Sequence, residues 1–109
     1  MFNVTVNNRR LGISFRHRVP ERRHRGATTA ILFDLGAEPR TELGSATVRV
    51  HPPDPFSKEG GRRKALAKLL NAATAFGELT RPDRAVIWSA FFTARGKAAP
   101  KFNGRLVAA

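Results

Sequence analysis

The chain of 109 residues contains no cysteine and no tyrosine, and acidic residues are scarce. Without cysteine it can form neither a disulfide framework nor a thiolate metal site. No run of apolar residues approaches the roughly 18 that a membrane-spanning helix needs. In residues 1–4 no charged start precedes an apolar run, so we expect no signal peptide. We therefore expect a cytoplasmic protein.

The scarcity of acids also limits the possible chemistry. Eight Asp and Glu residues oppose 20 Lys and Arg, which gives a formal net charge of +12. The acids are scattered, and no P-loop or G-x-S-x-G spacing is present. The three histidines, His17, His24 and His51, lack the spacing of metal ligands. We expect a non-enzymatic protein with no cofactor and no metal; a nuclease that uses His17 or His24 with a carboxylate is the alternative.

The positive charge points to the class of partner. A field of this strength favours anionic partners such as DNA, RNA, a nucleoprotein complex or an acidic protein face. A basic surface that serves only solubility is the alternative. A membrane and a small-molecule cofactor are not expected as partners, and a homodimer is left open.

Alternation of apolar and polar residues predicts β-strands in the first half. The segments 2–6, 11–15, 28–35 and 43–50 are rich in β-forming residues. Asn7 and Asn8 favour a turn, because asparagine tolerates positive φ. Consecutive strands joined by short turns predict an antiparallel meander of three or four strands.

Residues 16–26 form an arginine-rich segment with no period of two or 3.6, and Pro20 and Gly26 interrupt it. We expect a long loop or hairpin tip that acts as a phosphate-binding arm, because guanidinium groups match phosphate oxygens. Phe15, next to it, is a candidate for stacking on a base. A solvated surface loop is the alternative. The candidate binding residues of this segment are Arg16, Arg18, Arg22, Arg23 and Arg25.

Prolines at 52, 53 and 55 end the strand region, and helical patterns follow. Ser57 or Asp54 is expected to cap a helix over residues 62–76, with an apolar side that runs from Leu66 to Phe76, and Gly77 to end it. Thr80 and Asp83 predict the start of a second helix. Its apolar residues, Trp88 to Phe92 among them, favour burial in the core, with a dimer contact as the alternative.

These elements predict an α+β fold, in which the meander packs on two C-terminal helices. Residues 1–95 are expected to form a single domain. Residues 96–109 are expected to be a basic, partly flexible tail, and residues 106–107 are a candidate edge strand.

A second group of cations crowds the start of the first helix, where a helix already carries partial positive charge. This arrangement favours a bound anion. A structural role is the alternative, in which Arg62 pairs with Asp54 or Asp34 and fixes the helix to the sheet. The candidate binding residues here are Lys58, Arg62, Arg63, Lys64 and Lys68.

The same stretch resembles a group of small bacteriophage proteins with the pattern D-x-F-x-K-x-x-G-R-x-x-A-L-x-[KR] followed by a W-x-x-[FY] helix. The second part falls on Trp88 and Phe91 or Phe92. The similarity covers about the C-terminal half. Residues of the first part are Asp54, Phe56, Lys58, Gly61, Arg62, Ala65, Leu66 and Lys68.

The resemblance implies a phage or prophage origin and action on host machinery, including CRISPR effectors, or binding to nucleic acid. We therefore expect a protein that inhibits a host nucleoprotein defence complex, in the manner of an anti-CRISPR protein, through its cationic surface in the host cytoplasm. Direct binding of DNA or RNA is the alternative.

Overall fold

The computed structural model describes residues 2–21, 25–50, 57–94, 101–102 and 105–106. Four strands come first: β1 (Phe2–Val6), β2 (Arg9–Arg18), β3 (Ala27–Asp34) and β4 (Thr41–Arg49). Two helices follow, α1 (Lys58–Ala75) and α2 (Arg81–Ala94). The short strands β5 (Lys101–Phe102) and β6 (Arg105–Leu106) pair with each other, a pairing the sequence did not predict. The expected α+β fold is confirmed.

The four strands form an antiparallel sheet in the order β1-β2-β3-β4, which is the expected meander. The turn between β1 and β2 contains only Asn7 and Asn8, with φ of 51° and 64°. Both residues adopt the left-handed conformation of the tight turns that suit a hairpin twist. The asparagine pair therefore sets the register of the first hairpin.

Strand β2 is longer than the sequence analysis predicted. Arg16, His17 and Arg18 belong to the strand and pair with Thr29, Thr28 and Ala27 of β3. The expectation of a loop from residue 16 was wrong at this point. The physical reason is a period of two that the dense charge concealed: the arginines point to one side of the sheet and His17 to the other.

Helix α1 begins one turn earlier than predicted. Ser57 is the N-cap, and its hydroxyl accepts a hydrogen bond from the backbone N–H of Gly60 at 3.1 Å. The two glycines of the first turn were expected to precede the secure part of the helix, but they lie inside it. Gly61 lies directly against Thr28 of β3, where a Cβ atom would fall 2.1 Å from the threonine hydroxyl. The glycine thus lets the helix approach the sheet.

The two helices meet at the turn that the sequence predicted. Gly77 has φ of 82°, in the left-handed region that favours glycine after a helix. Thr80 and Asp83 exchange hydrogen bonds: the Thr80 N–H donates to the Asp83 carboxylate at 2.8 Å, and the Asp83 N–H donates to the Thr80 hydroxyl at 3.3 Å. This capping box begins α2. Phe76 was expected on the apolar side of α1, but it is the C-cap and is 87% exposed.

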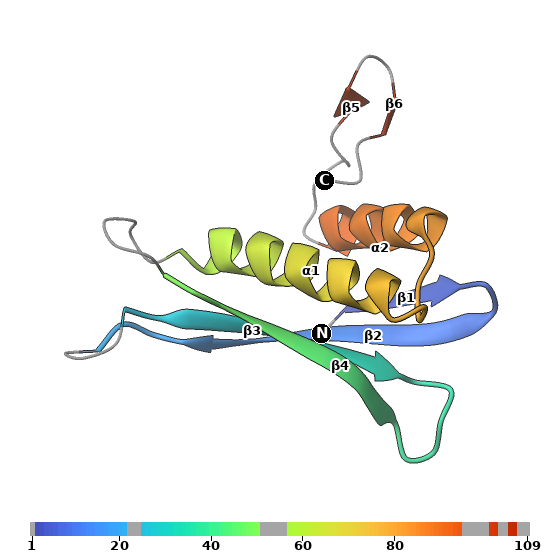
Figure 1. The fold of residues 1–109 in the computed structure, drawn as a ribbon, viewed down its shortest axis with the longest axis horizontal. Helices are drawn as coiled ribbons and strands as arrows, with labels where there is room; N and C mark the ends of the chain where they lie inside the picture. Colours follow the sequence, from blue (N-terminus) through green and yellow to red (C-terminus); the bar gives the residue numbers. More distant parts are fainter. Residues whose placement is uncertain (1, 22–24, 51–56, 95–100, 103–104, 107–109) are drawn as a thin grey trace.

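Both helices cover the same face of the sheet (Figure 1). Helix α1 packs on β3 and β4, and α2 packs on β1. Trp88 is 5% exposed and its ring lies 5.7 Å from Phe91 and 5.9 Å from Phe92, so the expected burial of this aromatic group is confirmed. The fully buried large side chains of this core are Leu11, Ile13, Leu32, Leu66, Leu69, Leu70, Ile87 and Phe91.

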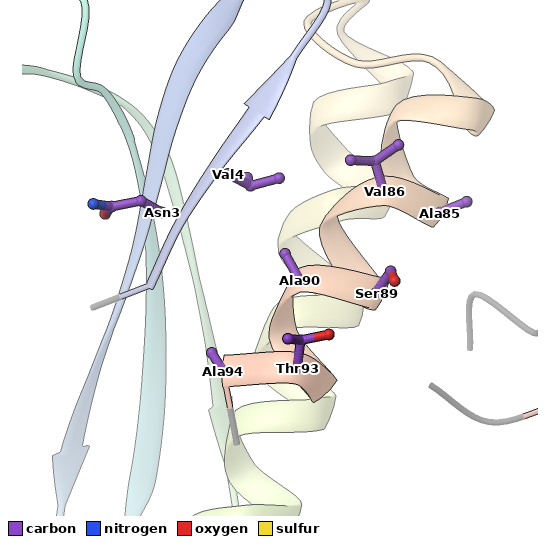
Figure 2. A pocket seen from close by; sticks show the side chains of 8 residues that line it. All are labelled: Asn3, Val4, Ala85, Val86, Ser89, Ala90, Thr93 and Ala94. Atoms are coloured by element: carbon purple, nitrogen blue, oxygen red, sulfur yellow. The ribbon is translucent and has the colours of Figure 1, made fainter. Parts of the chain in front are cut away.

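The other face of the sheet carries no described helix or strand, and we call it the open face. Val4 points towards α2 whereas its neighbour Asn3 points away from it, which shows the alternation plainly (Figure 2). By register, successive side chains of a strand alternate between the two faces, except where the register of β4 shifts opposite Leu32 and Phe33. None of the described helices is long and apolar enough to cross a membrane.

Candidate nucleic-acid interface

The β1–β2 turn, the β3–β4 turn and the α1–α2 loop lie at one end of the molecule (Figure 1). Most of the described acidic residues belong to these segments or lie next to them. Asn7 donates a hydrogen bond to Asp83 at 2.9 Å, and Arg9 lies 3.5 Å from the Glu78 carboxylate. We call this the neutral end, because arginines balance its carboxylates. Its acidic residues are Asp34, Glu38, Glu42, Glu78 and Asp83, and its arginines are Arg9, Arg10, Arg40, Arg81 and Arg84.

The opposite end, which we call the basic end, holds most of the site residues. Here β2 and β4 end, β3 begins, and α1 begins against Thr28. The end of α2 reaches the same place, since the Arg63 guanidinium lies 5.6 Å from the centre of the Phe92 ring. The described acidic residues at this end are Glu21 and Glu59. The cations are Arg16, Arg18, Arg25, Arg49, Lys58, Arg62, Arg63, Lys64 and Lys68.

Glu59 partly neutralises the start of α1. Its carboxylate lies 3.8 Å from the Arg62 guanidinium and 3.4 Å from that of Arg63. The predicted pairing of Arg62 with Asp34 does not occur, because Asp34 lies at the neutral end; Asp54 lies outside the described residues. Ion pairs between such partly exposed side chains contribute little to stability. One carboxylate shared by two guanidinium groups leaves the helix start positive.

His17 lies close to the cations at the start of α1. Its ring lies on the helix-covered face, with Nδ1 2.9 Å from the Thr28 hydroxyl. Burial lowers the pKa of His17 below its ordinary value, and the charges of Arg62 and Lys58 lower it further. The two cations of α1 thus lie close enough to His17 for their charges to act on its ring.

Arg16 and Arg18 do not lie on the same side of the sheet as the helix-start cations. Both are exposed on the open face, where Arg18 and Arg49 flank Ala27 across neighbouring strands. Two strand spacings separate this pair by about 10 Å. The basic end therefore carries cations on both sides of the sheet.

Lys68 connects the two sides at the β4 edge. Its ammonium group donates a hydrogen bond to the backbone carbonyl of Thr47 at 2.9 Å, and the Thr47 side chain lies on the open face. Lys64 is exposed one turn earlier on α1. Because this bond ties α1 to a backbone carbonyl of the edge strand β4, Lys68 has a structural role beside any binding role.

Two further predictions concern Arg22 with Arg23, and Phe15. Arg22 and Arg23 lie outside the described residues. Phe15, the candidate for base stacking, faces the helices and contacts Phe2 and Phe91 at ring distances of 6.3 and 5.9 Å. It belongs with the core rather than with the arginines beside it.

A groove of about 620 Å³ lies between β1 and α2 (Figure 2). Its lining is small and uncharged, with Val4, Ala85, Ser89 and Ala90 among the residues. Such a groove offers nothing to a phosphate. Among the described residues, no three His, Asp or Glu side chains come together as metal ligands.

The chain was compared with protein-family models, with curated proteins and with solved structures, and no match was found in any of the three. The candidate interface is therefore defined only by the positions of its own residues. Sequence reasoning missed Arg49, which the strand register places beside Arg18. Its position in the alternation of β4 is the signal that could have identified it.

Proposed function

We propose that this protein binds the phosphate backbone of nucleic acid through its basic end and acts by binding rather than by catalysis. The observation that supports the proposal is the separation of charge along the strand direction. Cations brought from β2, β4 and α1 occupy one end, and most described carboxylates occupy the other. A clustered field of one sign attracts a polyanion far better than the same charges spread evenly.

The proposed binding is electrostatic and depends on salt. Each phosphate neutralised by a lysine or arginine releases condensed counterions, so affinity falls as salt concentration rises. Burial lowers the pKa of His17, and the charges of Arg62 and Lys58 lower it further, so both cations lie near the same imidazole ring. Arg18 and Arg49 extend the field to the open face.

Two matched substitutions test the proposal. Lys58 and Arg81 are exposed first residues of α1 and α2, and changing either to glutamate alters the net charge equally. We expect Lys58→Glu to weaken binding of a labelled DNA or RNA oligonucleotide severalfold. The slope of log affinity against log salt should decrease by about one to two. Arg81→Glu should change both quantities little.

Fluorescence anisotropy titrations at several salt concentrations provide the measurement. Both variants should unfold at temperatures near that of the wild type, because a carboxylate at a helix start is tolerated. Equal losses of affinity in the two variants would mean that total charge matters and that the basic end does not.

The resemblance to bacteriophage proteins supports a second candidate, the inhibition of a host nucleoprotein defence complex in the bacterial cytoplasm. The observation in its favour is that three motif residues, Lys58, Arg62 and Lys68, all lie at the basic end. The same surface would then dock on the nucleic acid or acidic face of that complex.

A capture experiment from bacterial lysate separates the two candidates. The tagged protein is used with and without nuclease treatment of the lysate. A protein partner that is retained after nuclease treatment supports the inhibitor. Loss of every partner on nuclease treatment supports direct binding to nucleic acid.

A further inference from the structure

The open face of the sheet has a composition suited to one type of nucleic acid. Its middle rows are short hydroxyl side chains: Ser14 and Ser45 flank Ile31, and Thr29 lies beside Thr47. The two threonine hydroxyls are 2.7 Å apart, which confirms that they share this face. Hydroxyl groups can donate to or accept from any base edge.

Charge on the open face is almost entirely positive. Arg10, Arg16, Arg18 and Arg49 are exposed on it, and Glu42 is the one acidic side chain among its described strand residues. Arg16 ends the row of Thr29 and Thr47, and Arg18 and Arg49 lie in the next row towards the basic end. Phosphates at the arginines would therefore leave the bases over neutral side chains.

An aromatic side chain stands at the far end of the same rows. Phe33 lies on the open face opposite Glu42, and the Arg40 guanidinium lies over its ring, 4.7 Å from the ring centre. Both an aromatic ring and a guanidinium plane can stack on a nucleobase. The pair thus offers a flat cationic platform about four residues along β3 from Thr29.

We infer that the open face binds a single strand of nucleic acid, with phosphates on Arg16, Arg18 and Arg49 and bases directed to the hydroxyl rows and the Phe33–Arg40 platform. The inference rests on the proposed function and specifies its substrate. A duplex fits the face poorly, because its groove admits a helix or a two-stranded ribbon rather than a four-stranded sheet. Unpaired bases, by contrast, lie flat on such a face.

The test compares a single strand with a duplex of the same length and sequence, by fluorescence anisotropy at one salt concentration. Wild-type protein should bind the single strand at least tenfold more tightly. Ser45→Glu puts a carboxylate in the middle of the open face without touching the core, and it should abolish that preference. Phe33→Leu should weaken single-strand binding at least fivefold without changing its salt slope, because stacking releases no counterions.

Lys58→Glu, on the helix-covered side, is the control for phosphate binding in general, and thermal unfolding verifies that each variant is folded. If Phe33→Leu is destabilised, Ser45→Glu alone decides. Two results would overturn the inference and leave the proposed function intact. One is equal binding of duplex and single strand by the wild type. The other is a Ser45→Glu variant that binds as tightly as the wild type while Lys58→Glu loses affinity. No binding of either nucleic acid by the wild type would overturn both.

Discussion

At the scale of single residues, two adjacent glycines in the first turn of α1 have opposite surroundings. A Cβ atom on Gly61 would lie 2.1 Å from the hydroxyl and 2.9 Å from the Cβ of Thr28, which is buried. A Cβ atom on Gly60 would meet only the Ser57 side chain, at 3.4 Å or more. Gly61 is thus required for the packing of α1 on β3, whereas Gly60 lowers the helix propensity of α1 without a packing contact that requires glycine.

Substitution of each glycine by alanine should therefore have opposite effects. Gly61→Ala should lower the free energy of unfolding by about 1–3 kcal/mol, because the helix must move away from β3. Gly60→Ala should raise it by up to about 1 kcal/mol, because alanine loses less conformational freedom in a helix. Denaturant unfolding of both variants measures the difference. A similar effect in both would show that α1 does not contact Thr28 closely.

At the scale of elements, the junction of β2 with α1 couples stability to pH through His17. Its pKa is lowered in the folded protein by burial and by Arg62 and Lys58 of α1, while β3 contributes the neutral hydroxyl of Thr28. The unfolded chain therefore binds a proton more readily than the folded one. The stabilising contribution is complete above the ordinary histidine pKa of 6.5 and is lost as pH falls below it.

The free energy of unfolding should consequently decrease as the pH falls from about 7 to about 5, and His17→Gln should reduce that decrease. Lys58→Glu should raise the pKa of His17, since it replaces a repelling charge with an attracting one. Nuclear magnetic resonance titration of the imidazole and denaturant unfolding at several pH values test both statements. Identical pH profiles in wild type and His17→Gln would exclude His17 as the cause.

Elements were predictable where a local signal was strong. The asparagine turn, the Thr80–Asp83 capping box and the glycine at 77 each fix a boundary by backbone chemistry, and the structure follows them. The start of α1 was missed because glycines lower helix propensity, whereas Gly61 is explained by a contact with Thr28, far away in sequence. A contact between residues far apart in sequence produces no pattern in the neighbouring residues from which it could be predicted.

The candidate site was less predictable than the fold. Residue types identified Arg16, Arg18 and Arg62 as cations of interest, but only the strand register shows that the first two face away from α1. The same register brings Arg49 beside Arg18. The signal in the sequence is the alternation of residues 16–18, which their dense charge hides because dense charge is more typical of a loop.

At the scale of the whole molecule, the separation of charge gives the two ends different roles. At the neutral end, polar contacts join the first hairpin to the helices: Asn7 donates a hydrogen bond to Asp83, and Arg9 forms an ion pair with Glu78. The basic end gathers like charges, which repel one another in the folded state and destabilise it. Stability is thus reduced where binding is proposed, and an anion that binds there relieves the repulsion.

Salt should therefore raise the unfolding temperature of this protein. Added sodium chloride screens the repulsion at the basic end, and an increase of a few degrees between low and physiological ionic strength is expected. Replacing both Arg16 and Arg18 with glutamine should raise the unfolding temperature at low salt and make the salt-dependent increase in unfolding temperature smaller.

The control replaces both Arg10 and Arg81 with glutamine. It removes the same charge elsewhere and should leave most of the salt-dependent increase in place. Thermal unfolding at several salt concentrations gives the measurement. An equal reduction in the two double variants would show that repulsion is spread over the whole surface and that the basic end has no special share of it.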